Sequence, residues 1–104
     1  MHQFLNNWAN IERLSRQLAP QATSVAELES RMRSIFDTPM AAPRFRANWD
    51  RLRHMRNALV HSDGSNTVPT ANDVKQAHEL ATWLGDMLAR KLMDAQGAAG
   101  GATS

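Results

Sequence analysis

Residues 43–61 read PRFRANWDRLRHMRNALVH, and apolar side chains recur along them at steps of three, four and seven residues. This is the period of an α-helix with one buried face. The face comprises Phe45, Trp49, Leu52, Leu59 and Val60. Pro43 suits the first turn of a helix, and Ser62-Asp63-Gly64-Ser65-Asn66 has the composition of a turn. The sequence therefore predicts a helix over 43–61.

Helical periodicity appears three more times around this stretch. A helix over 2–18 is predicted by an apolar stripe and ends before Pro20. A second begins at Ser24, where Ser24-Val25-Ala26-Glu27 has the pattern of a capping box, and ends at 37–39. A last helix begins near Thr70, where Thr70-Ala71-Asn72-Asp73 resembles a capping box with Asp in place of Glu. The stripe of the first helix comprises Phe4, Trp8, Ile11, Ser15 and Leu18. The stripe of the second comprises Val25, Leu28, Met32, Ile35 and Phe36. The stripe of the last comprises Val74, Ala77, Ala81, Leu84 and Leu88.

The 104 residues make one small domain, and the absence of cysteine excludes disulfides and thiolate chemistry. We predict an all-α, up-and-down four-helix bundle over 1–95. A Gly/Ala-rich tail over 96–104 is too poor in apolar side chains to order itself, so we expect it to be flexible. A chain this small also gains stability from dimerisation.

Charge and hydropathy narrow the class of protein. No apolar run has the length of a membrane span, and the N-terminal residues do not form a signal peptide, so we expect a cytoplasmic protein without membrane contact. The formal net charge is only +2, yet ten of the twelve basic residues are Arg. Because Arg makes planar, bidentate contacts with phosphate and carboxylate, this bias favours anion recognition.

One residue breaks the pattern of the 43–61 helix. Arg56 lies near the middle of its apolar stripe, where a guanidinium is costly unless it is paired or reaches water. A second, entirely polar stripe comprises Asp50, His54, Asn57 and His61. His61 is about 140° around the helix from Arg56 and about 7.5 Å along it. The two side chains therefore meet only if the helix ends or bends at His61, or if a second copy completes the site.

The segment Arg56-Asn57-Ala58-Leu59-Val60-His61 resembles the signature of the HEPN family (higher eukaryotes and prokaryotes nucleotide-binding). That signature is Arg, a polar residue that is often Asn, and His after a gap of four to six residues. The context is similar too, since a turn and another amphipathic helix follow. The resemblance covers residues 43–95.

This resemblance implies a helical bundle that pairs through the motif-bearing helices. Many HEPN members are metal-independent endoribonucleases, among them toxins and defence effectors. Carried over, His61 is the acid/base residue, Arg56 the cation that contacts phosphate, and Asn57 the polar residue that supports them. The implied partners are RNA, a second copy, and an antitoxin or a larger defence complex. No cofactor or metal is expected.

One departure from the family concerns regulation. HepT-type toxins carry a Tyr two residues after the His, which their partner nucleotidyltransferase modifies. Here the order is His61-Ser62-Asp63, and the chain has no Tyr. We therefore do not expect that regulation in this protein.

The remaining arginines of the 43–61 helix are open to two interpretations. With His54 they form a basic face able to hold an RNA backbone, or they pair with Glu27, Glu29 or Asp37 of the preceding helix. The arginines in question are Arg44, Arg46, Arg51 and Arg53. Two alternatives to the nuclease also stay open: a non-catalytic HEPN-like module that binds nucleotide, nucleic acid or protein, and an unrelated helical interaction module. The last predicts that Arg56 pairs with Glu12 or Glu79 of its own chain.

Overall fold

The computed structural model describes residues 2–61 and 68–103, with side chains described for 2–60 and 68–96. It contains four α-helices in these ranges and no strand. The helices are α1 (His2–Leu18), α2 (Val25–Phe36), α3 (Pro43–His61) and α4 (Ala71–Thr103). The predicted all-α, four-helix bundle is confirmed, and the predicted helix boundaries differ from the observed ones mainly at the end of α4.

Two helix starts have the predicted caps. Ser24 Oγ accepts a hydrogen bond from Glu27 N at 3.1 Å, and Thr70 Oγ1 accepts one from Asp73 N at 3.2 Å. Asp73 returns the contact by accepting from Thr70 N at 2.8 Å, which completes a reciprocal capping box. Glu27 instead accepts from the backbone and hydroxyl of Thr23, one residue earlier than the usual box. These bonds lower the pKa of Glu27.

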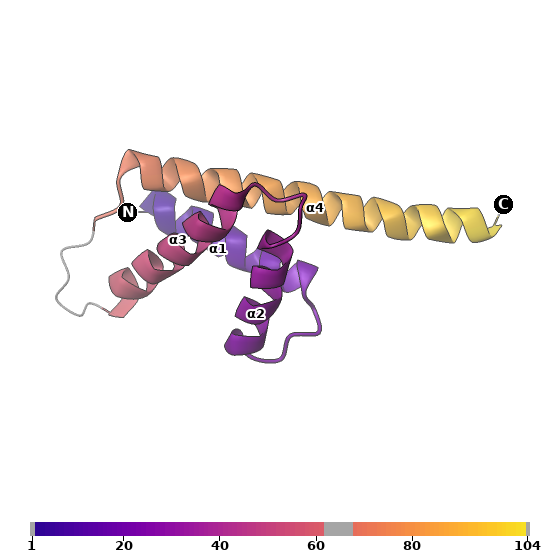
Figure 1. Cartoon of the computed structure of the whole chain (residues 1–104), viewed down its shortest axis with the longest axis horizontal. Helices are drawn as coiled ribbons and strands as arrows, with labels where there is room; N and C mark the ends of the chain where they lie inside the picture. Colours follow the sequence, from indigo (N-terminus) through magenta and orange to yellow (C-terminus); the bar gives the residue numbers. More distant parts are fainter. Residues whose placement is uncertain (1, 62–67, 104) are drawn as a thin grey trace.

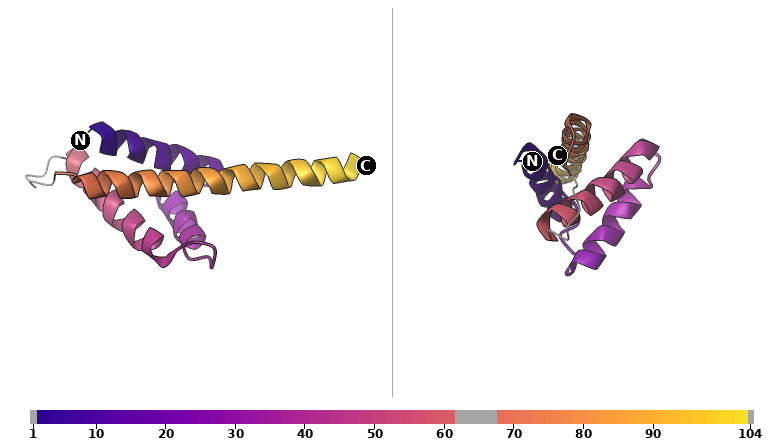
Figure 2. Two further views of the ribbon diagram at one scale, coloured as in Figure 1. Left: turned by 90° about the horizontal axis from the view of Figure 1, so that it is seen from above. Right: turned by 90° about the vertical axis from the view of Figure 1, so that its left-hand side faces the viewer.

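The helix directions differ from strict up-and-down order. Asn7 Nδ2 donates to Val74 O near the starts of α1 and α4, and Lys91 Nζ donates to Leu18 O farther along both helices. The first and last helices therefore run side by side in the same direction, as the left panel of Figure 2 shows. The antiparallel α2 and α3 cross this pair (Figure 1).

The core lies where the four helices meet. Phe4, Leu52, Leu80 and Leu84 are fully buried at its centre. Aromatic rings join α2, α3 and α4, since Trp83 lies 5.5 Å from Phe36 and 5.4 Å from Phe45, measured between ring centroids. Burial of these side chains is the main source of the bundle's stability.

Two side chains of the predicted apolar stripes are exposed, and so is Leu92 farther along α4. Val25 is 66% exposed at the first turn of α2, and Val60 is 53% exposed at the end of α3. Both lie at helix ends, where no neighbouring helix covers them. Leu92 of α4 is 57% exposed because α4 extends past the other helices (Figure 1). The backbone of α4 remains helical to Thr103, through most of the segment predicted as a tail.

Candidate functional site

Arg56 and Asn57 lie together on the last two turns of α3. Arg56 Nη1 donates to Asn57 Oδ1 at 3.2 Å, and both residues are half-buried. The guanidinium that the periodicity placed inside the apolar stripe therefore reaches the edge of the bundle. Two of the three predicted catalytic residues are brought into direct contact.

A carboxylate of the same chain faces Arg56. Glu12 Oε1 lies 3.7 Å from Arg56 Nε, and both side chains are about one-third exposed. Glu12 Oε1 also accepts a hydrogen bond from Trp8 Nε1 at 2.7 Å. The Arg56–Glu12 distance exceeds that of a hydrogen bond, and an ion pair this exposed contributes little stability. The contact is one of the two that an unrelated helical module predicts.

His61 is the last residue of α3. The side chain of His61 and residues 62–67 lie outside the described residues. The third predicted catalytic residue is thus known by its position at the helix end, five residues after Arg56.

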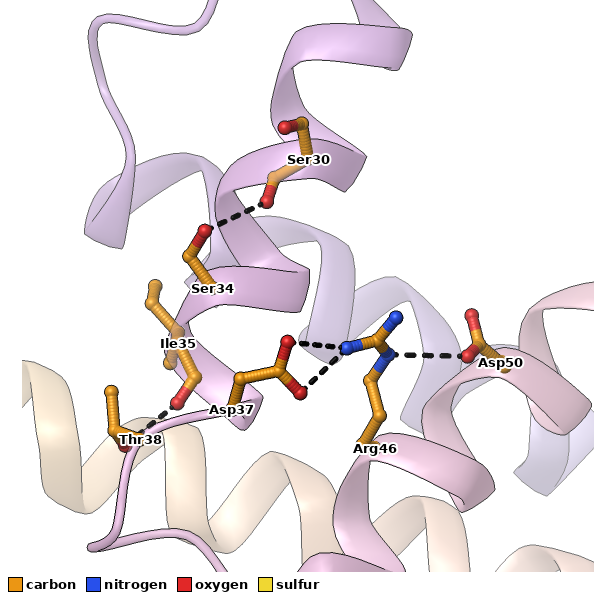
Figure 3. A network of polar contacts seen from close by, with 7 residues as sticks. All are labelled: Ser30, Ser34, Ile35, Asp37, Thr38, Arg46 and Asp50. Atoms are coloured by element: carbon orange, nitrogen blue, oxygen red, sulfur yellow. Dashed lines mark hydrogen bonds and ion pairs between the residues drawn. The ribbon is translucent and has the colours of Figure 1, made fainter.

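Two of the other arginines on α3 are held by short ion pairs. Arg46 Nη1 donates to both carboxylate oxygens of Asp37 at 2.6 Å, and its Nε contacts Asp50 Oδ2 at 3.3 Å (Figure 3). The hydrogen bonds with Asp37 raise the pKa of Arg46. Asp37 is the C-cap of α2, so this pair joins the end of α2 to the start of α3.

Arg51 makes the corresponding connection to α4. Its Nη1 donates to Asp73 Oδ1 at 2.6 Å, and its Nη2 donates to Gln76 Oε1. Burial tends to raise the pKa of Asp73, but the hydrogen bonds from Thr70 and Arg51 outweigh it, and the pKa lies below its ordinary value. Arg51 and Asp73 therefore form a structural contact that also includes the cap of α4.

Arg53 is placed differently from Arg46 and Arg51. Its Nη1 lies 3.4 Å from Glu29 Oε2, and its guanidinium carbon lies 5.5 Å from the centroid of the Trp49 ring. Its Nε is buried without a hydrogen-bond partner, and it is the sole buried side-chain nitrogen or oxygen of this kind within the described ranges. A buried donor without an acceptor costs free energy.

A cavity of about 170 Å³ lies between α1, α2 and α3, beside Arg56 and Asn57. Sequence analysis did not find it, because its lining comes from three helices. The apolar part of its lining comprises Trp8, Ile11, Val25, Leu28, Met32 and Trp49. The charged part comprises Glu12, Arg16, Glu29, Arg53 and Arg56.

The last two predicted RNA-binding residues are exposed. Arg44 lies at the start of α3, with its guanidinium carbon 5.0 Å from the centroid of the Phe45 ring, and His54 lies on the outer face of the helix. The predicted basic face is thus divided. Ion pairs hold Arg46, Arg51 and Arg53, and Arg44 and His54 face solvent.

Comparison of the chain with protein-family profiles, with curated proteins and with solved structures gave no match. Within the described residues, no helix is both long and apolar enough to cross a membrane. No group of three or more His, Cys, Asp or Glu side chains suited to a metal ion occurs in that part of the chain.

Proposed function

We propose that this protein is a metal-independent endoribonuclease of the HEPN type, with a site built by two copies of the chain. Arg56 is the cation that holds the scissile phosphate, Asn57 positions it, and His61 transfers protons. The observation that carries the proposal is the contact between Arg56 and Asn57 at the edge of the bundle, on the helix that also carries His61.

The chemistry needs few protein groups, because the ribose 2′-OH is an internal nucleophile beside the phosphorus. His61 takes the proton from the 2′-OH, and the oxygen attacks the phosphorus. Arg56 stabilises the negative charge on the non-bridging oxygens. The bond to the 5′-oxygen breaks, and His61 of the second copy donates a proton to it. The products are a 2′,3′-cyclic phosphate and a 5′-hydroxyl.

The contact with Glu12 is compatible with this role. A phosphate oxygen makes shorter, charge-assisted hydrogen bonds with a guanidinium than the 3.7 Å contact that Glu12 makes. Arg56 is also about one-third exposed, so an RNA phosphate has access to it.

The direct test is incubation of purified protein with RNA in EDTA, followed by analysis of the new ends. We expect cleavage with 2′,3′-cyclic phosphate and 5′-hydroxyl ends. Loss of activity in the chelator, or 3′-hydroxyl ends, would contradict the proposal. Solution mass is the accompanying measurement, because a monomer does not provide two copies of His61.

The alternative is an unrelated, non-catalytic helical interaction module. The ion pair between Arg56 and Glu12 within one chain favours it. Under this alternative RNA remains intact at high protein concentration.

A further inference from the structure

The cavity beside Arg56 has the size of a single ring system. Ligand sites for whole drug-sized molecules have volumes of about 300–1,000 Å³. The volume here is about 170 Å³, which leaves room for one planar group but not for a base together with its ribose and phosphate. Arg56 and Asn57 line the cavity too, so a sugar-phosphate chain outside it meets the proposed catalytic residues.

The inner lining of the cavity is aromatic and aliphatic. Trp8 and Trp49 are only 5% and 3% exposed, and Met32 and Ile11 are fully buried. Such an apolar lining is suited to an uncharged planar ring such as a nucleobase. An apolar lining alone does not select one base.

Selection comes from the charged groups of the lining. Arg53 lines the cavity with a guanidinium, and Glu29 and Glu12 line it with carboxylates. The contacts that now hold Arg53 and Arg56 to these carboxylates are long, at 3.4 and 3.7 Å. A base that has acceptors on one edge pairs with the guanidinium groups. If it also has two neighbouring donors on another edge, it pairs with a carboxylate as well.

Guanine has this pattern of donors and acceptors. Its N7 and O6 accept hydrogen bonds, typically from Arg, and its N1–H and N2–H₂ form a pair of donors that matches the two oxygens of a carboxylate. Adenine and cytosine present an exocyclic amino group without an adjacent ring N–H donor, and uracil has no amino group. Resting on the proposed function, we propose that the cavity is a base subsite that binds a guanine of the RNA substrate next to the scissile phosphate.

The test is a titration with GMP, AMP, CMP and UMP followed by NMR of the three indole N–H resonances. Trp8 and Trp49 line the cavity, whereas Trp83 does not, so Trp83 is an internal control. We expect GMP to shift the resonances of Trp8 and Trp49 with an affinity at least tenfold above that of AMP. Equal affinities for all four nucleotides, or no shift with GMP, would overturn the proposal.

Two variants locate the binding. Arg53→Lys keeps the positive charge and removes the planar guanidinium, so we expect about a tenfold loss of GMP affinity and of the preference over AMP. Leu28→Trp places a large side chain in the cavity and should abolish binding without changing a charged group. Arg13→Lys is the matched control, because Arg13 is exposed and does not line the cavity. Unchanged GMP binding in Leu28→Trp would exclude this cavity.

The GMP titration and the RNA cleavage assay test the base subsite and the nuclease proposal independently. If the protein cuts RNA but GMP shifts no indole resonance, the subsite is wrong and the nuclease proposal stands. If GMP binds with the expected preference but RNA remains intact, the cavity is a guanine site and the nuclease proposal fails.

Discussion

The two halves of α3 carry the same kind of charge in different settings. In the first half, Arg46 and Arg51 donate to Asp37 and Asp73 at 2.6 Å, and these bonds attach α3 to α2 and α4. In the second half, Arg53 and Arg56 face Glu29 and Glu12 at 3.4 and 3.7 Å, beside an open cavity. Figure 3 shows the closed arrangement around Arg46.

This difference distinguishes arginines that hold the helices together from arginines that are free to bind a ligand. A short pair with both carboxylate oxygens satisfies a guanidinium and leaves little reason for it to bind anything else. A long contact and a buried Nε without a partner leave hydrogen-bonding capacity unused. We therefore interpret the first half of α3 as holding the bundle together and propose that the second half binds the substrate.

The largest expected effect is on cleavage when Arg56 is changed. Arg56→Ala should lower the rate of RNA cleavage by at least about 100-fold, because it removes the charge that stabilises the transition state. Its unfolding free energy should change by less than about 0.5 kcal/mol, since the Glu12 pair is exposed. Quantitative cleavage assays and urea denaturation measure the two effects, with Arg13→Ala as the control. Strong destabilisation by Arg56→Ala would place this residue with the structural arginines.

Asp73→Ala should produce the largest loss of stability among the charged residues discussed. It removes both the cap of α4 and the buried partner of Arg51, which together contribute about 2 kcal/mol. Urea denaturation measures the change in unfolding free energy. A loss below about 0.5 kcal/mol would show that the contact between α3 and α4 is not structural.

Stability should fall in acid because of the same carboxylate. The pKa of Asp73 is lower in the folded protein than its ordinary value of 3.8. Its contribution is therefore fully present above the unfolded value and is lost as the pH falls through that value toward the folded pKa. Thermal unfolding between pH 7 and pH 2 should show this loss, and Asp73→Asn should reduce it. An identical pH dependence in Asp73→Asn would contradict the assignment.

Arg46→Ala should have the smallest effect of these substitutions, a slight loss of stability. Its pairs with Asp37 and Asp50 are short, but all three side chains are at least one-third exposed and water screens them. Thermal denaturation at low and high salt measures this. The difference between Arg46→Ala and the unaltered protein should shrink at high salt, and a difference independent of salt would indicate lost packing instead.

The sequence predicted what depends on local pattern. Helix periodicity and the caps at Ser24 and Thr70 involve residues within a few positions of one another, and these features are present in the fold. The parallel direction of α1 and α4 was not predictable, because it depends on how α2 and α3 cross them. Val25 was predicted to lie on a buried face but is exposed. Periodicity predicts which face of a helix is apolar, but it does not predict whether another helix covers that face.

The candidate site was predicted only in part for the same reason. Arg56 and Asn57 are adjacent in sequence, so their contact follows from the motif. The cavity combines Trp8 and Glu12 of α1 with Glu29 of α2 and Arg53 of α3, and no spacing within the chain reveals it. The two interpretations of the arginines were separated only by the positions of Asp37, Glu29 and Asp73.

The most direct measurement of the central claim uses an RNA strand with one altered ribose. The cleavage position is first mapped in EDTA, and the nucleotide on its 5′ side is then replaced by its 2′-deoxy form. We predict that the all-ribose strand is cut, that the substituted strand is not cut at that position, and that His61→Ala cuts neither. Failure to cut the all-ribose strand, or equal cleavage of both strands, would contradict the assignment of Arg56, Asn57 and His61 to RNA transesterification.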